Sequence, residues 1–415
     1  MLPEHRHPFA YRDYACYWVT RLASTVAQNC MIIVIGWQVY DVARLTMGPR
    51  AAAVQLGLVG LAQFLPLLCL ILISGWIADR IDRRIVLRAC TALQLLCATV
   101  LAATTLSGAI SLLWLFGVAI LLGVSRAFSM PASAALAPAL VPAPVLPRAI
   151  ATGAIAGRVG AIVGPALGGF LYATAPHAPY LLSCGLFTSS LLLAFMIRPT
   201  VRVAMARTDN PWRQMVDGLA YVSRHRVVLG AISLDLFAVL LGGATALLPV
   251  YSRDILQVGP SGLGQLRAAP AVGALTAAIW FSWRPLRHEV GIKMLASVAA
   301  FGMATAIFGL SRSMPLSLAC LVALGAADML SMHVRQSLVQ LSTPDEMRGR
   351  VSAVSSLFVS ASNELGEAES GFLAGAVGPV AAVTGGGIAA IVVAVVWARK
   401  FPALRRSETY DILRR

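Results

Sequence analysis

Residues 75–84 read Gly75-Trp-Ile-Ala-Asp79-Arg80-Ile-Asp82-Arg83-Arg84, and this short charged stretch separates two long apolar runs. The runs cover residues 52–77 and 85–107. Each is long enough to cross a bilayer, which takes about 20 apolar residues. Arginines gathered in a loop between two such runs are typical of the cytoplasmic side of a membrane protein. The stretch therefore predicts two transmembrane helices joined by a short cytoplasmic loop.

The composition extends this prediction to the whole chain. Of 415 residues, 58% are hydrophobic and only 12% are charged, and the mean hydropathy is +0.77. A soluble domain carries charge on about a quarter of its residues. Because lipid-exposed backbone must satisfy its own polar groups, we expect an all-α membrane protein of twelve transmembrane helices. We place them at 14–40, 52–77, 85–107, 111–135, 147–173, 178–197, 226–251, 261–283, 293–311, 316–339, 351–376 and 379–399.

The distribution of basic residues predicts the orientation. With the N-terminus inside, 24 of the 33 Lys and Arg residues fall in inside segments, four in outside loops and five within helices. This bias predicts that both termini are cytoplasmic, in the inner membrane of a bacterium. The longest loop divides the chain into an N-terminal six-helix half (1–197), a cytoplasmic linker (198–225) and a C-terminal six-helix half with a short basic tail (226–415). Within the linker, the amphipathic stretch Trp212–Val222 is expected to lie on the membrane surface.

Several other classes of protein are disfavoured. The seven cysteines are scattered, and no Cys/His spacing suits a metal. No glycine-rich phosphate loop indicates direct use of ATP, and no catalytic constellation surrounds His333. The basic residues form no Arg/Gly or Arg/aromatic tract of the kind that binds nucleic acid. We therefore expect no enzymatic activity, cofactor, metal or nucleic acid. The expected partners are a small-molecule substrate, protons and the bilayer, and we expect a monomer.

The stretch Gly75–Arg84 resembles the signature loop of the major facilitator superfamily, G-x-x-x-D-R-x-G-R-R. The match keeps Gly75, Asp79, Arg80, Arg83 and Arg84, while Asp82 replaces the second glycine, the residue type that tolerates φ > 0. The resemblance implies a gating latch, in which Gly75 allows close helix approach and Asp79 pairs with an arginine or a helix N-terminus. An ordinary positive-inside loop is the alternative.

A second motif lies in the predicted fifth helix. Gly160-Ala-Ile-Val-Gly164-Pro165-Ala-Leu-Gly168-Gly169 is similar to the antiporter motif of the same superfamily, G-x-x-x-G-P-x-x-G-G, at every position. Small residues at this spacing allow close helix packing, and Pro165 removes a backbone donor. The resemblance implies export, whereas ordinary helix packing is the alternative.

Further stretches resemble the enterobactin-exporter branch of the superfamily, which also includes macrolide efflux proteins. They are Ala127–Ala132, Pro138–Pro142, Ser233–Phe237, Thr343–Arg350 and Ser362–Glu367. The resemblance covers essentially the whole chain and implies a transporter that works by alternating access, without indicating the substrate.

Ionisable groups within predicted helices are costly, and they usually line a pathway or pair with one another. Arginines in both halves are candidate charge partners: Arg21, Arg126, Arg158, Arg267 and Arg335. Within the predicted helices, away from their ends, acidic residues occur only in the C-terminal half, which suggests ion pairs between the halves. The candidates for proton coupling are Asp235, Glu364, Glu367 and Asp328.

Spacing refines the roles of these acids. Glu364 and Glu367 are three residues apart on one helix face, so both carboxylates should not ionise easily in an apolar cavity. Asp328 and Arg335 are two turns apart, so Arg335 could point into the same water-filled cleft. The alternative for each acid is a structural ion pair, which we favour for Glu369.

Polar residues near the middle of the first predicted helix, Gln28 and Asn29, are candidates for the substrate cavity. Gly242, Gly243 and Pro249 predict a gating bend in the seventh helix, with loose packing as the alternative. The combined hypothesis is proton-coupled export of a small amphipathic molecule such as a siderophore or a drug. A symporter that imports its substrate and a non-transporting membrane sensor remain the alternatives.

Overall fold

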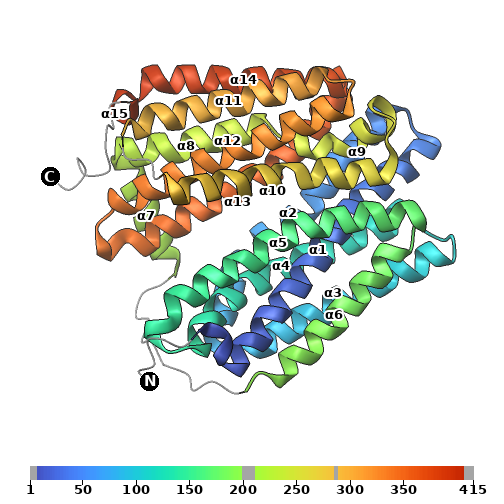
Figure 1. The fold of residues 1–415 in the computed structure, drawn as a ribbon, viewed down its shortest axis with the longest axis horizontal. Helices are drawn as coiled ribbons and strands as arrows, with labels where there is room; N and C mark the ends of the chain where they lie inside the picture. Colours follow the sequence, from blue (N-terminus) through green and yellow to red (C-terminus); the bar gives the residue numbers. More distant parts are fainter. Residues whose placement is uncertain (1–6, 199–210, 285–287, 406–415) are drawn as a thin grey trace. The chain divides into compact units, whose positions relative to one another are not determined.

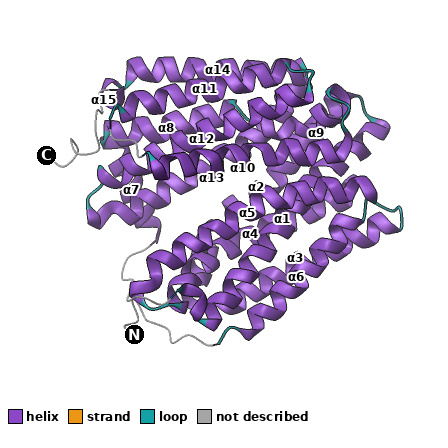
Figure 2. Ribbon diagram, in the orientation of Figure 1, coloured by secondary structure: helices purple, strands orange, loops and turns teal. Residues whose placement is uncertain are grey.

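The computed structural model describes residues 7–198, 211–284 and 288–405, which form long helices joined by short loops (Figures 1 and 2). The N-terminal elements are η2 (Pro8–Ala10), α1 (Arg12–Thr46), α2 (Pro49–Arg80), α3 (Arg83–Leu106), α4 (Leu112–Leu136), η3 (Ala137–Leu140), η4 (Ala143–Val145), α5 (Leu146–Thr174) and α6 (Ala178–Met196). The C-terminal elements are α7 (Pro211–Arg224), α8 (Arg226–Leu241), η5 (Ala244–Leu247), α9 (Leu248–Val250), η6 (Tyr251–Ile255), α10 (Gly259–Trp283), α11 (Val290–Leu310), α12 (Met314–Leu341), α13 (Asp345–Val377), α14 (Pro379–Lys400) and α15 (Pro402–Arg405).

The helices follow the apolar segments of the sequence closely, and the all-α fold is confirmed. The predicted segment 85–107 is α3, and 379–399 is α14, with ends that differ by one or two residues. Helix α1 runs six residues beyond the predicted end at 40, and α13 begins six residues before the predicted start at 351. The largest difference is in segment 226–251, which was predicted as one helix and is broken after Leu241. Glycine at both positions of the break weakens the helix there, and Pro249 removes a backbone donor.

Ten helices within the described residues are long and apolar enough to cross a membrane. Helix α13 is not one of them, because it carries Glu364, Glu367 and Glu369 in addition to charges in its first turns. The outward side chains of the spans are large and apolar, as a lipid solvent requires; Leu113, Phe170 and Leu192 are examples. The protein is therefore a multi-pass membrane protein, whereas the number twelve and the position of the termini stay predictions.

The chain folds as two compact units that exchange short segments. The first unit comprises Met1–Leu45, Ala62–Arg207 and Gly259–Ala268. The second comprises Thr46–Leu61, Thr208–Val258 and Ala269–Arg415. The first half of α2 thus belongs with the C-terminal helices, and the start of α10 belongs with the N-terminal helices. The predicted division into 1–197, 198–225 and 226–415 stays a prediction, and part of that linker, 199–210, lies outside the described residues.

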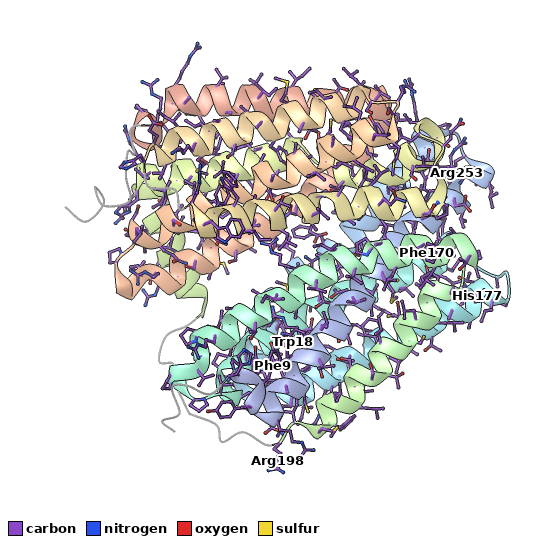
Figure 3. The ribbon with its side chains drawn as sticks, in the orientation of Figure 1. Phe9, Trp18, Phe170, His177, Arg198 and Arg253 are labelled. Atoms are coloured by element: carbon purple, nitrogen blue, oxygen red, sulfur yellow. The ribbon has the colours of Figure 1, made fainter. Side chains whose placement is uncertain are left out.

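Aromatic residues at the start of α1 fasten it to α4 and α5 in the first unit. The buried hydroxyl of Tyr14 donates to Ala149 O at 2.6 Å, and that of Tyr17 donates to Ser133 O at 2.9 Å. The indole of Trp18 donates to Thr152 O at 2.9 Å, and its ring meets Phe9 edge-on with centroids 5.2 Å apart (Figure 3). These bonds satisfy buried polar groups within the apolar bundle.

The second unit has an apolar core between α8, α11, α12 and α14. It contains buried residues from each helix, including Leu234, Val298, Val334 and Val393. Helices α11 and α14 are in close contact at two glycines, since a Cβ added to Gly302 would lie 2.5 Å from the Gly387 oxygen. Small residues let backbones approach, which favours association of helices in lipid.

The contact between α10 and α12 gives a direct test of this packing. A Cβ on Gly325 would lie 1.9 Å from the Pro270 oxygen, so Gly325→Ala should force the helices apart and cost about 1–3 kcal/mol. Gly185→Ala in α6 is the matched control, because a Cβ there meets nothing within 4 Å. Thermal unfolding of both variants in detergent should show a lower midpoint for Gly325→Ala alone. Equal midpoints would contradict the packing.

Candidate transport site

The signature-like loop joins α2 to α3 without a left-handed residue. Asp82 adopts φ −59° and ψ 120° and is the N-cap of α3, where its carboxylate accepts a 3.0 Å hydrogen bond from Arg84 N. The substitution of the signature glycine by Asp82 is thus compatible with the turn, because an aspartate cap replaces conformational freedom. Gly75 and Asp79 lie in the last turns of α2, and their side-chain environments lie outside what the structure describes.

Arg84 binds both the loop that precedes α3 and the end of α6. It donates to the Asp82 carboxylate at 3.1 and 2.5 Å and to Ile197 O, just after α6, at 3.1 Å. Arg88 donates to Ala194 O at 3.1 Å and stacks on the Phe195 ring. Both arginines therefore satisfy carbonyls at the C-terminal end of α6, where a helix leaves four acceptors unpaired. Arg80 is exposed and Arg83 is half-buried.

The glycines of the antiporter-like motif face two different helices. A Cβ on Gly160, Gly164 or Gly168 would lie 2.6–2.8 Å from atoms of α1. A Cβ on Gly169 would lie 2.4 Å from the Pro260 oxygen of α10. Pro165 is buried inside the continuous helix α5, between these two contacts. The motif therefore brings α5 into close contact with α1 on one face and with the start of α10 on another.

The two residues of α1 that are candidates for the substrate cavity lie at or beside the contact between α1 and α5. The amide of Asn29 donates to Thr25 O at 2.9 Å, and its Cβ lies 2.7 Å from the position that a Cβ on Gly164 would take. Gln28 beside it is half-buried. Arg21 donates to the hydroxyl of Tyr17 at 3.3 Å, one turn earlier.

The other predicted charge partners are spread over several helices. Arg126 on α4 and Arg267 on α10 are half-buried, and Arg158 on α5 is exposed. Their roles in ion pairing between the halves stay a prediction.

Asp235 and Arg335 form a buried ion pair between α8 and α12. Arg335 Nη1 donates to Asp235 Oδ2, and the two side chains are 5% and 4% exposed. Arg335 therefore points into the bundle, and not into a water-filled cleft with Asp328 as its spacing suggested. Asp328 is half-buried two turns earlier on α12. The pair lies within one unit, so it holds α8 to α12.

This ion pair is incompletely satisfied by hydrogen bonds. Arg335 Nε is buried without a hydrogen-bond partner, and so is the hydroxyl of Ser331, one turn away on α12. An unmade hydrogen bond in an apolar setting costs about 1–3 kcal/mol per group. The arrangement therefore keeps two polar groups in an unfavourable environment next to the buried Asp235–Arg335 pair.

Helix α13 carries three carboxylates among close backbone contacts. A Cβ on Gly57 of α2 would lie 2.8 Å from the Ala368 oxygen, and one on Gly60 would lie 3.4 Å from Glu367 Cβ. Glu364 is buried, with 8% exposure, and Glu367 is half-buried. Glu369 Oε2 is buried without a hydrogen-bond partner. The carboxylates thus lie on a helix that packs tightly against the first half of α2.

The break after α8 lies against a neighbouring face of α13. A Cβ on Gly243 would lie 2.5 Å from the Gly366 oxygen and 2.6 Å from Ser370 Oγ. Gly242 is similarly close to the Phe301 ring of α11, at 2.6 Å. Beyond the break, Tyr251 donates to Gly309 O at 2.7 Å and so fixes the π turn to α11. The predicted bend is therefore an interruption of the helix, with tight packing and not loose packing.

Two features of this site were not predicted. The first is the close contact of α2 with α13, where a Cβ on Gly371 would lie 2.5 Å from Gly57 Cα. The second is the set of hydrogen bonds that Arg84 donates to the Asp82 carboxylate and to Ile197 O. Glycines four residues apart, at 371 and 375, were a signal for the first contact.

The buried ion pair can be tested by removing one or both charges. Asp235→Leu alone leaves Arg335 buried without its counter-ion and should lower the free energy of unfolding by about 3–5 kcal/mol. The double variant Asp235→Leu/Arg335→Met should regain most of that loss, because no uncompensated charge remains. Thermal midpoints in detergent check this, and a double variant as unstable as Asp235→Leu would contradict the pairing.

The comparisons with known proteins agree with this architecture. The model of the transmembrane secretion effector family matches residues 5–413. The enterobactin exporter EntS of Escherichia coli O1:K1 is 27% identical over 292 residues, which are 68% of each chain. A crystal structure of a D-xylose-proton symporter superposes with a TM-score of 0.72 at 14% identity, over 96% of this chain and all of that one.

A bacterial homolog of the human lysosomal transporter Spinster, in its inward-facing and unoccupied conformation, gives a TM-score of 0.71 at 15% identity, over 96% of this chain and 97% of that one. At such identities the structures show the fold alone. The family model covers nearly the whole chain, so the resemblance in the motifs is confirmed. This chain belongs to the transmembrane secretion effector family and is a transporter of the major facilitator superfamily, in its exporter branch.

Proposed function

We propose that this chain is a proton-coupled exporter of a small amphipathic molecule, such as a siderophore or a drug. It works by alternating access in the bacterial inner membrane, with twelve transmembrane helices in two six-helix halves and both termini in the cytoplasm. It acts as a monomer, with protons and the substrate as its partners.

The position of the carboxylates on α13 carries the proposal. Glu364 is buried in the helix bundle, and Glu367 lies at the close contact with Gly60 of α2. Burial penalises the charged form of a carboxylate, so binding a proton offsets part of the cost of keeping it inside the bundle. Because α13 also packs against the break after α8, gain or loss of a proton acts where two helix contacts meet.

Asp235 is the second candidate for coupling. Its carboxylate is held by Arg335, and a proton on Asp235 would weaken that bond and release α8 from α12. Asp328, half-buried on the same helix as Arg335, is a third candidate. On the N-terminal side, we assign Gln28 and Asn29, which lie at or beside the contact between α1 and α5, to the substrate cavity.

The proton gradient supplies enough free energy for this function. One proton moving through a potential of ~150 mV releases about 3.5 kcal/mol, which supports a substrate gradient of roughly 300-fold. Export is the favoured direction because the antiporter-like motif is complete and the relatives are named as exporters of enterobactin.

Transport by inside-out vesicles tests the function. Vesicles with an acidified lumen that contain the purified chain should accumulate a catecholate siderophore, a macrolide or a cationic dye, and nigericin should abolish the accumulation. Substrate uptake by right-side-out vesicles instead would show a symporter, and binding without flux in either orientation would show a sensor.

Variants of the carboxylates test the coupling. Glu364→Gln and Glu367→Gln should reduce gradient-driven accumulation at least tenfold. Counterflow of labelled substrate should be unchanged, because it needs no net proton movement. Glu289→Gln is the matched control, because Glu289 is exposed outside the predicted spans. Full gradient-driven transport by both variants would remove these two residues from the coupling mechanism.

A further inference from the structure

Helix α7 is the one long described helix that belongs to the linker, and transport does not account for it. Its two faces differ. Gly218, Tyr221 and Val222 face the protein, whereas Val216 and Leu219 are 47% and 40% exposed. The exposed residues are three apart, so they form a continuous outward face, extended by Ser223.

The inner face is fastened firmly to the junction of α12 and α13. Tyr221 donates to Ser342 O at 2.8 Å, and Asp217 pairs with Arg350 at 3.1 Å. A Cβ on Gly218 would lie 2.9 Å from the Arg350 oxygen, so the backbones of α7 and α13 are in contact. Burial raises the pKa of the Tyr221 hydroxyl above its ordinary value.

The outer face combines apolar and positive groups. The one acidic side chain of α7, Asp217, is turned to Arg350. Arg224, His225 and Arg226 are exposed at the C-terminal end of the helix. An exposed apolar face beside cations, with the acid turned away, is complementary to the headgroups and upper acyl chains of an anionic lipid layer.

The place of α7 in the chain favours lipid over a soluble acidic partner. Only His225 separates α7 from α8, and the membrane span that contains α8 begins at Arg226. The end of α7 therefore lies at the membrane boundary, within the few Ångströms over which a charged lipid surface attracts cations.

We propose that the exposed apolar side of α7 (Val216 and Leu219), together with Arg224 at its end and Arg226 at the start of α8, binds anionic phospholipid. The bound lipid holds α7 against the α12–α13 junction through the Tyr221 and Asp217 contacts. This inference rests on the membrane-spanning fold and not on the proposed proton coupling.

The test measures binding of phosphatidylglycerol to the purified full chain in detergent by native mass spectrometry, with phosphatidylcholine as the reference lipid. An arginine beside an anionic lipid layer contributes roughly a fivefold change in affinity, so Arg224→Gln/Arg226→Gln should weaken the tightest phosphatidylglycerol binding roughly 25-fold. Val216→Ser/Leu219→Ser should weaken binding of both lipids, because it removes the apolar contact.

The matched control is Arg399→Gln/Lys400→Gln, which removes two exposed cations at the end of α14. It should leave the tightest binding unchanged, and all variants should keep the thermal midpoint of the wild type in phosphatidylcholine. Free glycerol phosphate should not compete. Unchanged phosphatidylglycerol affinity in the α7 arginine variant, or an equal loss in the α14 control, would overturn the proposal, as would competition by glycerol phosphate.

Discussion

Close approach of helix backbones at glycine is the constraint on which this structure depends. In lipid the apolar side chains gain little by leaving their solvent, so helices associate where their surfaces fit closely. The structure places such contacts between α5 and α1, between α10 and α12, and between α11 and α14. The residues at these contacts are glycines because any Cβ would meet a backbone atom or a buried side chain. Most of the glycines whose surroundings the structure describes lie at such close contacts.

The polar groups of the bundle follow a second constraint, since each must find a partner inside the protein. Tyr14, Tyr17 and Trp18 do so through helix carbonyls. Asp235 and Arg335 do so through each other. On α13, Glu369 Oε2 is buried without a hydrogen-bond partner, and Glu367 borders a glycine contact. Groups that are expensive to keep charged, on a helix that packs against both α2 and α8, are suited to couple a proton to movement.

The sequence predicted the fold better than the site. Apolar runs are an unambiguous signal for membrane helices, so the ends of α3 and α14 were predicted to within two residues. The interruption at Gly242 and Gly243 was underestimated as a bend, because propensity does not show which backbones pack against these glycines. The pairing of Asp235 with Arg335 was also missed. Their separation of 100 residues carries no spacing signal, and the rotation of α12 about its axis is fixed by packing alone.

The central claim is that substrate binding and proton release are linked through α13. The most direct measurement follows the pH of a weakly buffered solution of the purified protein as substrate is added near neutral pH. The account predicts that the wild type releases protons in proportion to bound substrate, and that Glu364→Gln binds substrate with a much smaller release. Saturable substrate binding by the wild type with no proton release at any pH between about 5 and 8, the range in which buried carboxylates can titrate, would contradict it.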